Sequence, residues 1–174
     1  MNAFVEILKI LIPAGAVFAA AYLLVKRFLD NDQKRREHEL KKSAQGTITP
    51  LKIQAYERIV IFLERINPNS LVIRVNKNGM SARQLHQELV ASVKSEYEHN
   101  LSQQIYISAG AWELVKTSKE EIIQLINISS SKVAPDANSS ELAMMILNIC
   151  ANLGKKLPSD IAIDYIKKEI SQNF

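Results

Sequence analysis

Residues 49–68, "TPLKIQAYERIVIFLERINP", decide the fold class of this 174-residue chain. An α-helix has about 3.6 residues per turn, and the apolar residues recur at intervals that place them on one helical face. These residues are Leu51, Ala55, Ile59, Phe62, Leu63 and Ile66. Thr49 as a cap and Pro50 in the first helical position mark the expected start. The pair Asn67 and Pro68 marks the end, so an amphipathic helix is predicted here.

Helix signals recur downstream of this segment. Ser81 and Gln84 have the spacing of a capping box, in which each side chain bonds the other's backbone N–H. Apolar positions follow at helical spacing: Leu85, Leu89, Val93 and Tyr97. Asn138 and Glu141 form a second such pair and open the apolar stretch "ELAMMILNICANL". Two further helices are therefore predicted to begin at these pairs.

The other segments agree with a helical chain. Apolar periodicity predicts a helix around Trp112 and a last helix from Ser159, with Tyr165 facing inward. Residues 70–75, "SLVIRV", are rich in β-branched side chains and predict either a strand or a short helix. Five Gly and five Pro favour long helices over a turn-rich β fold. The prediction is an all-α bundle over residues 47–174, with about 125 residues to bury a core of its own.

The first 25 residues predict a transmembrane helix. Residues 10–25, "ILIPAGAVFAAAYLLV", carry no charge. A helix of roughly 23 residues over residues 3–25 would reach about 34 Å, enough to cross a hydrocarbon core of about 30 Å. A cleaved signal peptide and a buried helix of a soluble protein are the alternatives. Glu6 near the start and the apolar run that continues beyond Ala21 favour an uncleaved signal anchor.

Residues 26–46 form a charged juxtamembrane stalk in this prediction. They hold seven Lys/Arg against four Asp/Glu, a net charge of +3, whereas residues 47–174 hold fourteen against thirteen, a net charge of +1. Short basic flanks stay in the cytoplasm, so the bundle is expected inside the cell and the N-terminus outside. The near-neutral bundle lacks the basic face that nucleic-acid binding requires.

The stalk has two interpretations. It either only fixes the membrane topology or also contacts anionic lipid, to which each cation near the surface contributes about 1 kcal/mol. The cations available for that contact are Lys26, Arg27, Lys34, Arg35 and Arg36.

Residues 96–112, "EYEHNLSQQIYISAGAW", combine amide and aromatic side chains in one short window. The candidate site residues are His99, Asn100, Gln103, Gln104, Tyr106 and Trp112. Three interpretations stay open: a structural corner, in which Leu101 and Ile105 pack inward and the amides bond the backbone, a surface for a partner, or a catalytic site. The structural corner is favoured, because buried amides that are hydrogen-bonded fix a single geometry.

No catalytic, metal-binding or cofactor-binding residue is predicted. Glu96 and His99 have the Glu-x-x-His spacing of di-iron bundles, but those sites need a second such pair, and neither His38 nor His86 has a Glu at that distance. Cys150 lies on an apolar helix, where a free cysteine behaves as a small apolar side chain.

Three stretches carry a resemblance to a known family: "PLKIQAYERIVIFLERI", "EYEHNLSQQIYIS" and the "AW" at residues 111–112. Together with the position of the N-terminal span, they resemble an uncharacterised family of small single-pass inner-membrane proteins of Bacteroidota. The resemblance covers residues 50–112 and implies a bacterial inner-membrane setting, with no assigned activity and no catalytic residue.

The sequence therefore predicts a membrane-anchored helical adaptor or assembly protein that presents its cytoplasmic bundle to a protein partner, including a second copy of itself. The alternative is an enzyme or ligand-binding module that uses the cluster of His99, Gln103, Gln104 and Tyr106. The absence of a recognisable catalytic constellation in the sequence favours the adaptor.

Overall fold

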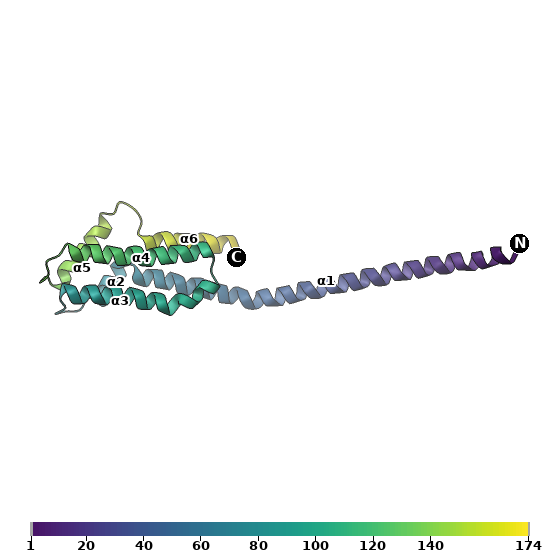
Figure 1. Ribbon diagram of the computed structural model, residues 1–174, viewed down its shortest axis with the longest axis horizontal. Coiled ribbons are helices and arrows are strands. Elements are labelled where there is room, and N and C mark those ends of the chain that lie inside the picture. Colours follow the sequence, from purple (N-terminus) through teal and green to yellow (C-terminus); the bar gives the residue numbers. More distant parts are fainter. Residues whose placement is uncertain (1, 174) are drawn as a thin grey trace. The chain divides into compact units, whose positions relative to one another are not determined.

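The structure is a computed structural model that describes residues 2–173, apart from the side chains of residues 2–8, 10–14, 16, 44 and 173. The helices are α1 (Asn2–Ile66), α2 (Pro68–Val75), α3 (Ala82–Asn100), the 3-10 helix η1 (Leu101–Ile105), α4 (Ala109–Ser131), α5 (Ser139–Ala151) and α6 (Pro158–Asn173) (Figure 1). No strand occurs among the described residues. The prediction of an all-α fold is confirmed.

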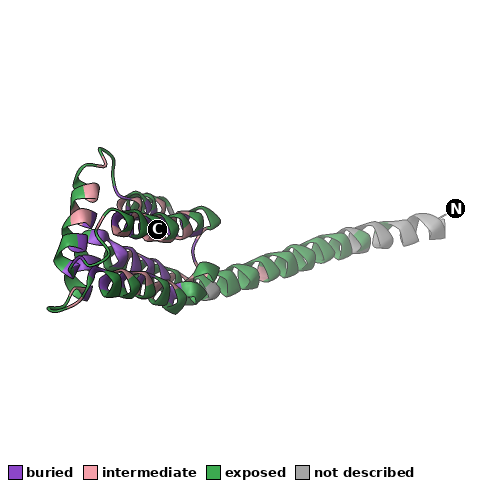
Figure 2. Cartoon of the chain, turned by 60° about the vertical axis from the view of Figure 1, so that its left-hand side comes forward, coloured by how far each residue is buried: buried purple, intermediate pink, exposed green. Residues whose placement is uncertain are grey.

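The chain divides into two units, Met1–Thr49 and Pro50–Phe174. The first unit is helical, and nearly all of its described side chains are exposed (Figure 2). The predicted helix start at Thr49 is wrong, because the backbone is already helical before that residue and α1 continues through Pro50. A proline inside a helix removes one N–H donor, here the one that would bond the carbonyl group of Gly46, and the helical path continues on both sides.

About half of the side chains in the predicted membrane span, residues 3–25, lie outside the described residues. Its large apolar side chains that are described are exposed: Val17, Phe18, Tyr22, Leu23, Leu24 and Val25. Within the part of the chain that the structure describes, none of the helices combines the length and the apolar composition that crossing a membrane requires.

The core of the second unit begins with the last three turns of α1. The buried face of α1 consists of Ala55, Tyr56, Ile59, Phe62, Leu63 and Ile66. Leu51 was expected on this face but is exposed, because the buried face starts one turn later at Ala55. Among the other helices, α4 packs against α3, α5 and α6, so it occupies a central place in the bundle (Figure 1).

Residues 70–75 belong to a short helix, α2. The Asn67 side chain accepts a hydrogen bond from the N–H of Asn69, and Pro68 occupies the first helical position. Leu71 and Val72 are buried whereas Ile73 is exposed, a pattern that fits helical rather than alternating geometry. The N-cap at Asn67 and the burial of one helical face therefore make this segment a helix, although its composition also suits a strand.

Both predicted capping boxes are present, at Ser81 with Gln84 and at Asn138 with Glu141. The two helix starts also lie side by side, joined by an isolated antiparallel bridge between Ser81 and Asn138. In this bridge the N–H of Ala82 donates to the carbonyl oxygen of Ala137 at 2.9 Å. The pairing links segments more than fifty residues apart, which the local sequence pattern does not reveal.

The last helix, α6, buries a narrower face than the sequence predicts. Ala162 and Ile166 are fully buried, but Tyr165 is exposed, contrary to its expected inward position. The Tyr165 hydroxyl lies against the start of α4, where a Cβ placed on Gly110 would come within 2.6 Å of it. The absence of a side chain at Gly110 therefore leaves room for this contact between α4 and α6.

The helical geometry of α2 predicts opposite effects for two apolar residues that a strand would place on the same face. Leu71→Ala should lower the free energy of unfolding by about 2–5 kcal/mol, because Leu71 is only 1% exposed. Ile73→Ala should change it by less than about 0.5 kcal/mol, because Ile73 is 78% exposed. Chemical denaturation of residues 47–174, which contain every buried residue described, measures both values. Equal losses for the two variants would contradict the helical assignment.

Candidate functional site

A cleft of about 480 Å³ opens between α1 and α3 on the second unit. From α1 it is lined by Arg58, Ile61 and Arg65, and from α3 by Ser95, Glu96, His99 and Asn100. Residues spaced by three or four share one face of a helix, so each wall of the cleft is a single helical face. Helical periodicity aligns the side chains within each wall. The packing of α3 against α1 then brings the two walls together, although about thirty residues separate them along the chain.

An ion pair crosses the cleft from one wall to the other. Oε1 of Glu96 accepts hydrogen bonds from Arg65, with Nε at 2.7 Å and Nη2 at 2.6 Å. Nη1 of Arg74, at the end of α2, lies 3.6 Å from the same oxygen, and Nη2 of Arg74 donates to the Arg65 carbonyl oxygen at 3.2 Å. The Glu96 side chain is 18% exposed, so its carboxylate is partly shielded from water. One carboxylate thus connects α1, α2 and α3.

Positive charge exceeds negative charge around this carboxylate. Arg65 and Arg74 share Glu96, and Arg58 is exposed with no ion pair among the described residues. Each guanidinium group has five N–H donors, far more than one carboxylate can satisfy. The cleft is therefore a cationic site with N–H donors that face solvent, and the apolar side chain of Ile61 lies between two of its arginines.

The six candidate residues from the sequence do not form one site. Asn100 is buried, and its Nδ2 donates to the carbonyl oxygen of Glu96 at 2.8 Å, at the last turn of α3. His99 is exposed and borders the cleft. Nε2 of Gln103 donates to the Ser102 hydroxyl at 3.2 Å, while Gln104 is exposed and its side chain makes no hydrogen bond within the described part of the chain.

Trp112 and Tyr106 occupy the inner side of this stretch. The buried Trp112 stacks on Tyr97 with ring centroids 5.5 Å apart, and Tyr97 in turn lies 6.1 Å from Phe62 of α1. Lys119 adds a cation over the Tyr97 ring, with Nζ 4.4 Å from its centroid. The rings of Phe62, Tyr97 and Trp112 therefore join α1, α3 and α4 and belong to the packing of the bundle. Tyr106 is half-buried at the end of η1.

The predicted inward positions of Leu101 and Ile105 are wrong. Both side chains are exposed, Ile105 to 73%. The α-helical spacing used for that prediction ends at Asn100, where the chain continues as η1. A 3-10 helix has about three residues per turn, so the rotation between successive side chains changes and the apolar positions turn outward.

A second polar cluster escaped the sequence analysis. The carboxylate of Glu169 on α6 accepts two hydrogen bonds, from the Tyr56 hydroxyl at 2.6 Å and from the Ser108 hydroxyl at 2.8 Å. Ser108 also caps α4 by accepting a hydrogen bond from the N–H of Ala111 at 3.1 Å. Burial, followed by the hydrogen bond and charge of Glu169, raises the pKa of Tyr56 to about 12. Only the cap at Ser108 has a local sequence signal, since Tyr56 and Glu169 are 113 positions apart.

Comparison with known protein families shows the family of this chain. A family model described as a family of unknown function, DUF7935, matches residues 2–173. The chain belongs to the DUF7935 family. No curated protein and no solved structure matches it. The family assignment agrees with the resemblance to an uncharacterised family and adds no activity to it.

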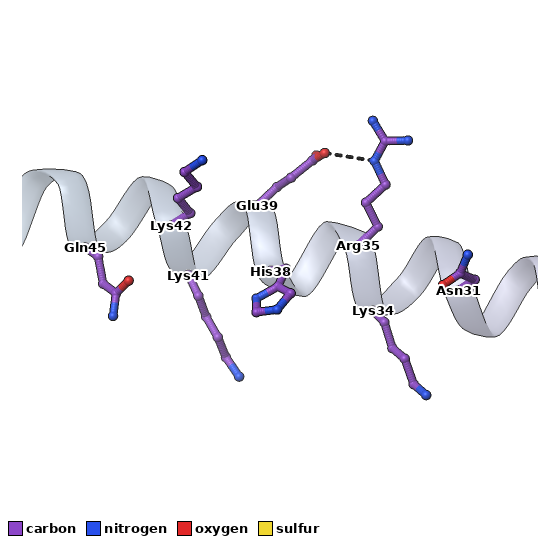
Figure 3. A pocket seen from close by; sticks show the side chains of 8 residues that line it. All are labelled: Asn31, Lys34, Arg35, His38, Glu39, Lys41, Lys42 and Gln45. Atoms are coloured by element: carbon purple, nitrogen blue, oxygen red, sulfur yellow. Dashed lines mark hydrogen bonds and ion pairs between the residues drawn. The ribbon is translucent and has the colours of Figure 1, made fainter.

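The first unit of this DUF7935 protein carries a polar face on α1. Lys34, His38, Lys41 and Gln45 point to one side of the helix, and Arg35 points away from them toward Glu39 (Figure 3). Nε of Arg35 donates to Glu39 at 3.0 Å, and Arg36 pairs with Asp32 at the same distance. These side chains come from a single helix and border open space, so this surface differs from the two-walled cleft between α1 and α3.

The burial of Asn100 predicts a stability defect that Gln104 should not share. Asn100→Ala should lower the free energy of unfolding of this DUF7935 bundle by about 1–3 kcal/mol, because it removes a buried hydrogen bond at the end of α3. Gln104→Ala, the matched control on the exposed side of η1, should stay within about 0.5 kcal/mol. Thermal and chemical denaturation measure both, and an equal loss in the two variants would contradict the different environments assigned to these amides.

The Tyr56 hydroxyl predicts a dependence of stability on alkaline pH. Its folded-state pKa of about 12 exceeds the ordinary value of 10.0, so the folded state retains the proton more strongly. The resulting contribution to stability is fully present below pH 10 and disappears as the pH rises toward 12. The stability difference between the wild type and Tyr56→Phe should therefore shrink over that interval, by at most about 2–3 kcal/mol.

Denaturation of both proteins at a series of pH values measures that difference. Tyrosinate absorbance provides an independent readout, since the wild type should show an ionisation step near pH 12 that Tyr56→Phe lacks. A constant stability difference across the interval would contradict the assigned environment of Tyr56.

Proposed function

We propose that this DUF7935 protein is a membrane-anchored helical adaptor that presents its bundle to a protein partner through the cleft between α1 and α3. The observation that carries the proposal is the combination of Arg58, Ile61 and Arg65 on one exposed helical face. Arginine together with an apolar side chain is typical of protein interfaces, where arginine is enriched relative to other charged residues. The two helices that form the walls of the cleft, α1 and α3, both contribute buried side chains to the core of the bundle. The walls are therefore in place before a partner binds.

The membrane anchor in this proposal is the apolar run in residues 3–25. The resemblance of residues 50–112 supports a single-pass inner-membrane protein of Bacteroidota. The charge pattern supports an N-terminus outside and a bundle in the cytoplasm, because cations predominate after the apolar run. Contact with anionic lipid would fall mainly to Lys26, Arg27 and Lys34, since Arg35 and Arg36 each pair with an acidic residue of the same helix. Such exposed pairs are weak and open to competition from lipid phosphates.

The alternative is an enzyme or ligand-binding module built on His99, Gln103, Gln104 and Tyr106. Of these four residues, His99 lines the cleft, and the lining contains none of the other three. Gln103 instead bonds its neighbour Ser102. The adaptor is therefore the better-supported function, because the residues that line the cleft are those of a binding surface.

Site-specific photocrosslinking in intact cells tests the proposal. A photoreactive amino acid in place of Ile61 should capture a discrete protein partner, because this side chain lies in the cleft. The same amino acid in place of Ile73, which is exposed on α2 outside the cleft lining, is the matched control. Mass spectrometry of the crosslinked band identifies the partner, and a band of twice the chain mass would identify a second copy. The same bands from both positions, or no band at residue 61, would count against the cleft as the adaptor surface.

A further inference from the structure

We infer that the cleft between α1 and α3 binds an acidic peptide segment, whose carboxylates bond Arg58 and compete with Glu96 for Arg65. This inference rests on the proposed function and names the chemistry of the partner. The occupant is a segment in which acidic residues flank an apolar one.

Glu96 leaves part of the hydrogen-bonding capacity of its arginine partners unused. Both contacting nitrogens of Arg65 converge on Oε1 of Glu96, and Nη1 of Arg74 lies 3.6 Å from the same oxygen. A planar guanidinium group binds a carboxylate best through two parallel bonds to two oxygens. The arrangement within the chain is not of that kind, so an incoming carboxylate can offer Arg65 or Arg58 a geometry that Glu96 does not provide.

The charge of the cleft also favours an acidic occupant. Arg65 and Arg74 contact the carboxylate of Glu96, and Arg58 lines the same cleft, so these three cations exceed this one anion by two charges. The surrounding domain is almost neutral, with fourteen Lys/Arg and thirteen Asp/Glu in residues 47–174. A local cationic cleft on a neutral domain suits a short acidic segment, whereas a nucleic acid needs an extended basic surface for its phosphates.

The cleft also has an apolar part, which is the side chain of Ile61. Ile61 lies three residues after Arg58 and four before Arg65, so it occupies the same face of α1 between the two cations. Its side chain is 49% exposed, and an apolar side chain of the partner would cover it. The site therefore presents a cation, an apolar side chain and a second cation in a row, which matches an acidic, apolar, acidic order in the partner.

Fluorescence anisotropy of the full-length protein in detergent micelles tests the inference. The probe is a short fluorescein-labelled peptide in which glutamates flank a leucine, and the matched control peptide has glutamine at each glutamate. The acidic peptide should bind and the glutamine peptide should not. Arg58→Gln should weaken binding about tenfold, the loss expected for one charge-assisted hydrogen bond. Arg83→Gln, which removes an exposed arginine of α3 outside this cleft, should leave the affinity unchanged.

The decisive variant is Glu96→Gln. It removes the carboxylate that competes for Arg65 and Arg74, so the acidic peptide should bind several-fold more tightly. Because an unfolded or loosened protein would not gain affinity, this increase also controls for effects of the substitutions on folding. Unchanged or weaker binding by Glu96→Gln would overturn the inference, as would equal losses from Arg58→Gln and Arg83→Gln.

Two competitors separate the acidic peptide from other anions. Inorganic phosphate at millimolar concentration and a single-stranded DNA oligonucleotide should displace the peptide poorly, and efficient displacement by either would overturn the assignment to a peptide. The crosslinking experiment at residue 61 tests the proposed function independently of the peptide-binding experiment. A captured partner with no binding of the acidic peptide would refute only the partner's chemistry, whereas no captured partner would refute the proposed function itself.

Discussion

One apolar face of α1 constrains the rest of the bundle. From Ala55 to Ile66 this face is buried against the other helices, with Phe62 next to the Tyr97 ring of α3. Since a helix turns by a fixed angle per residue, burial of this face leaves Arg58, Ile61 and Arg65 at its edge. The core and the candidate site are therefore two consequences of a single periodicity, and the cleft needs no irregular backbone to form.

The ion pair of Arg65 with Glu96 has a modest energetic role within that frame. Partly exposed pairs of this kind contribute about 0.2–1 kcal/mol, less than a single well-buried apolar side chain such as Phe62. Its main consequence is positional, because one carboxylate holds the ends of α1 and α2 against α3 while several N–H donors face solvent. A second carboxylate, that of Glu169, links α6 to α1 and to the start of α4 in the same way. It accepts hydrogen bonds from the hydroxyl groups of Tyr56 and Ser108.

Local signals in the sequence predict the parts of the structure that depend on neighbours in the chain. The capping boxes at Ser81 and Asn138 were predictable because both partners lie within four residues. The outward positions of Leu101 and Ile105 were not predictable, because the backbone changes from an α-helix to a 3-10 helix at that point. Contacts between distant residues, such as Tyr56 with Glu169 or Arg65 with Glu96, depend on how the helices pack and leave no spacing pattern in the sequence. The candidate stretch of residues 96–112 consequently splits between the packing, at Asn100 and Trp112, and the border of the cleft, at His99.

The most direct measurement of the central claim is an NMR titration that follows the Nε–H signals of the arginine side chains. The full-length protein in micelles is titrated with the acidic peptide, and variants assign the signals of Arg58, Arg65 and Arg83. The account predicts that Arg58 and Arg65 shift in a saturable manner with one common dissociation constant, while the signal of Arg83 stays in place. Equal, unsaturable shifts at all three arginines, or no shift at Arg58 and Arg65, would contradict the cleft as the partner-binding site of this protein.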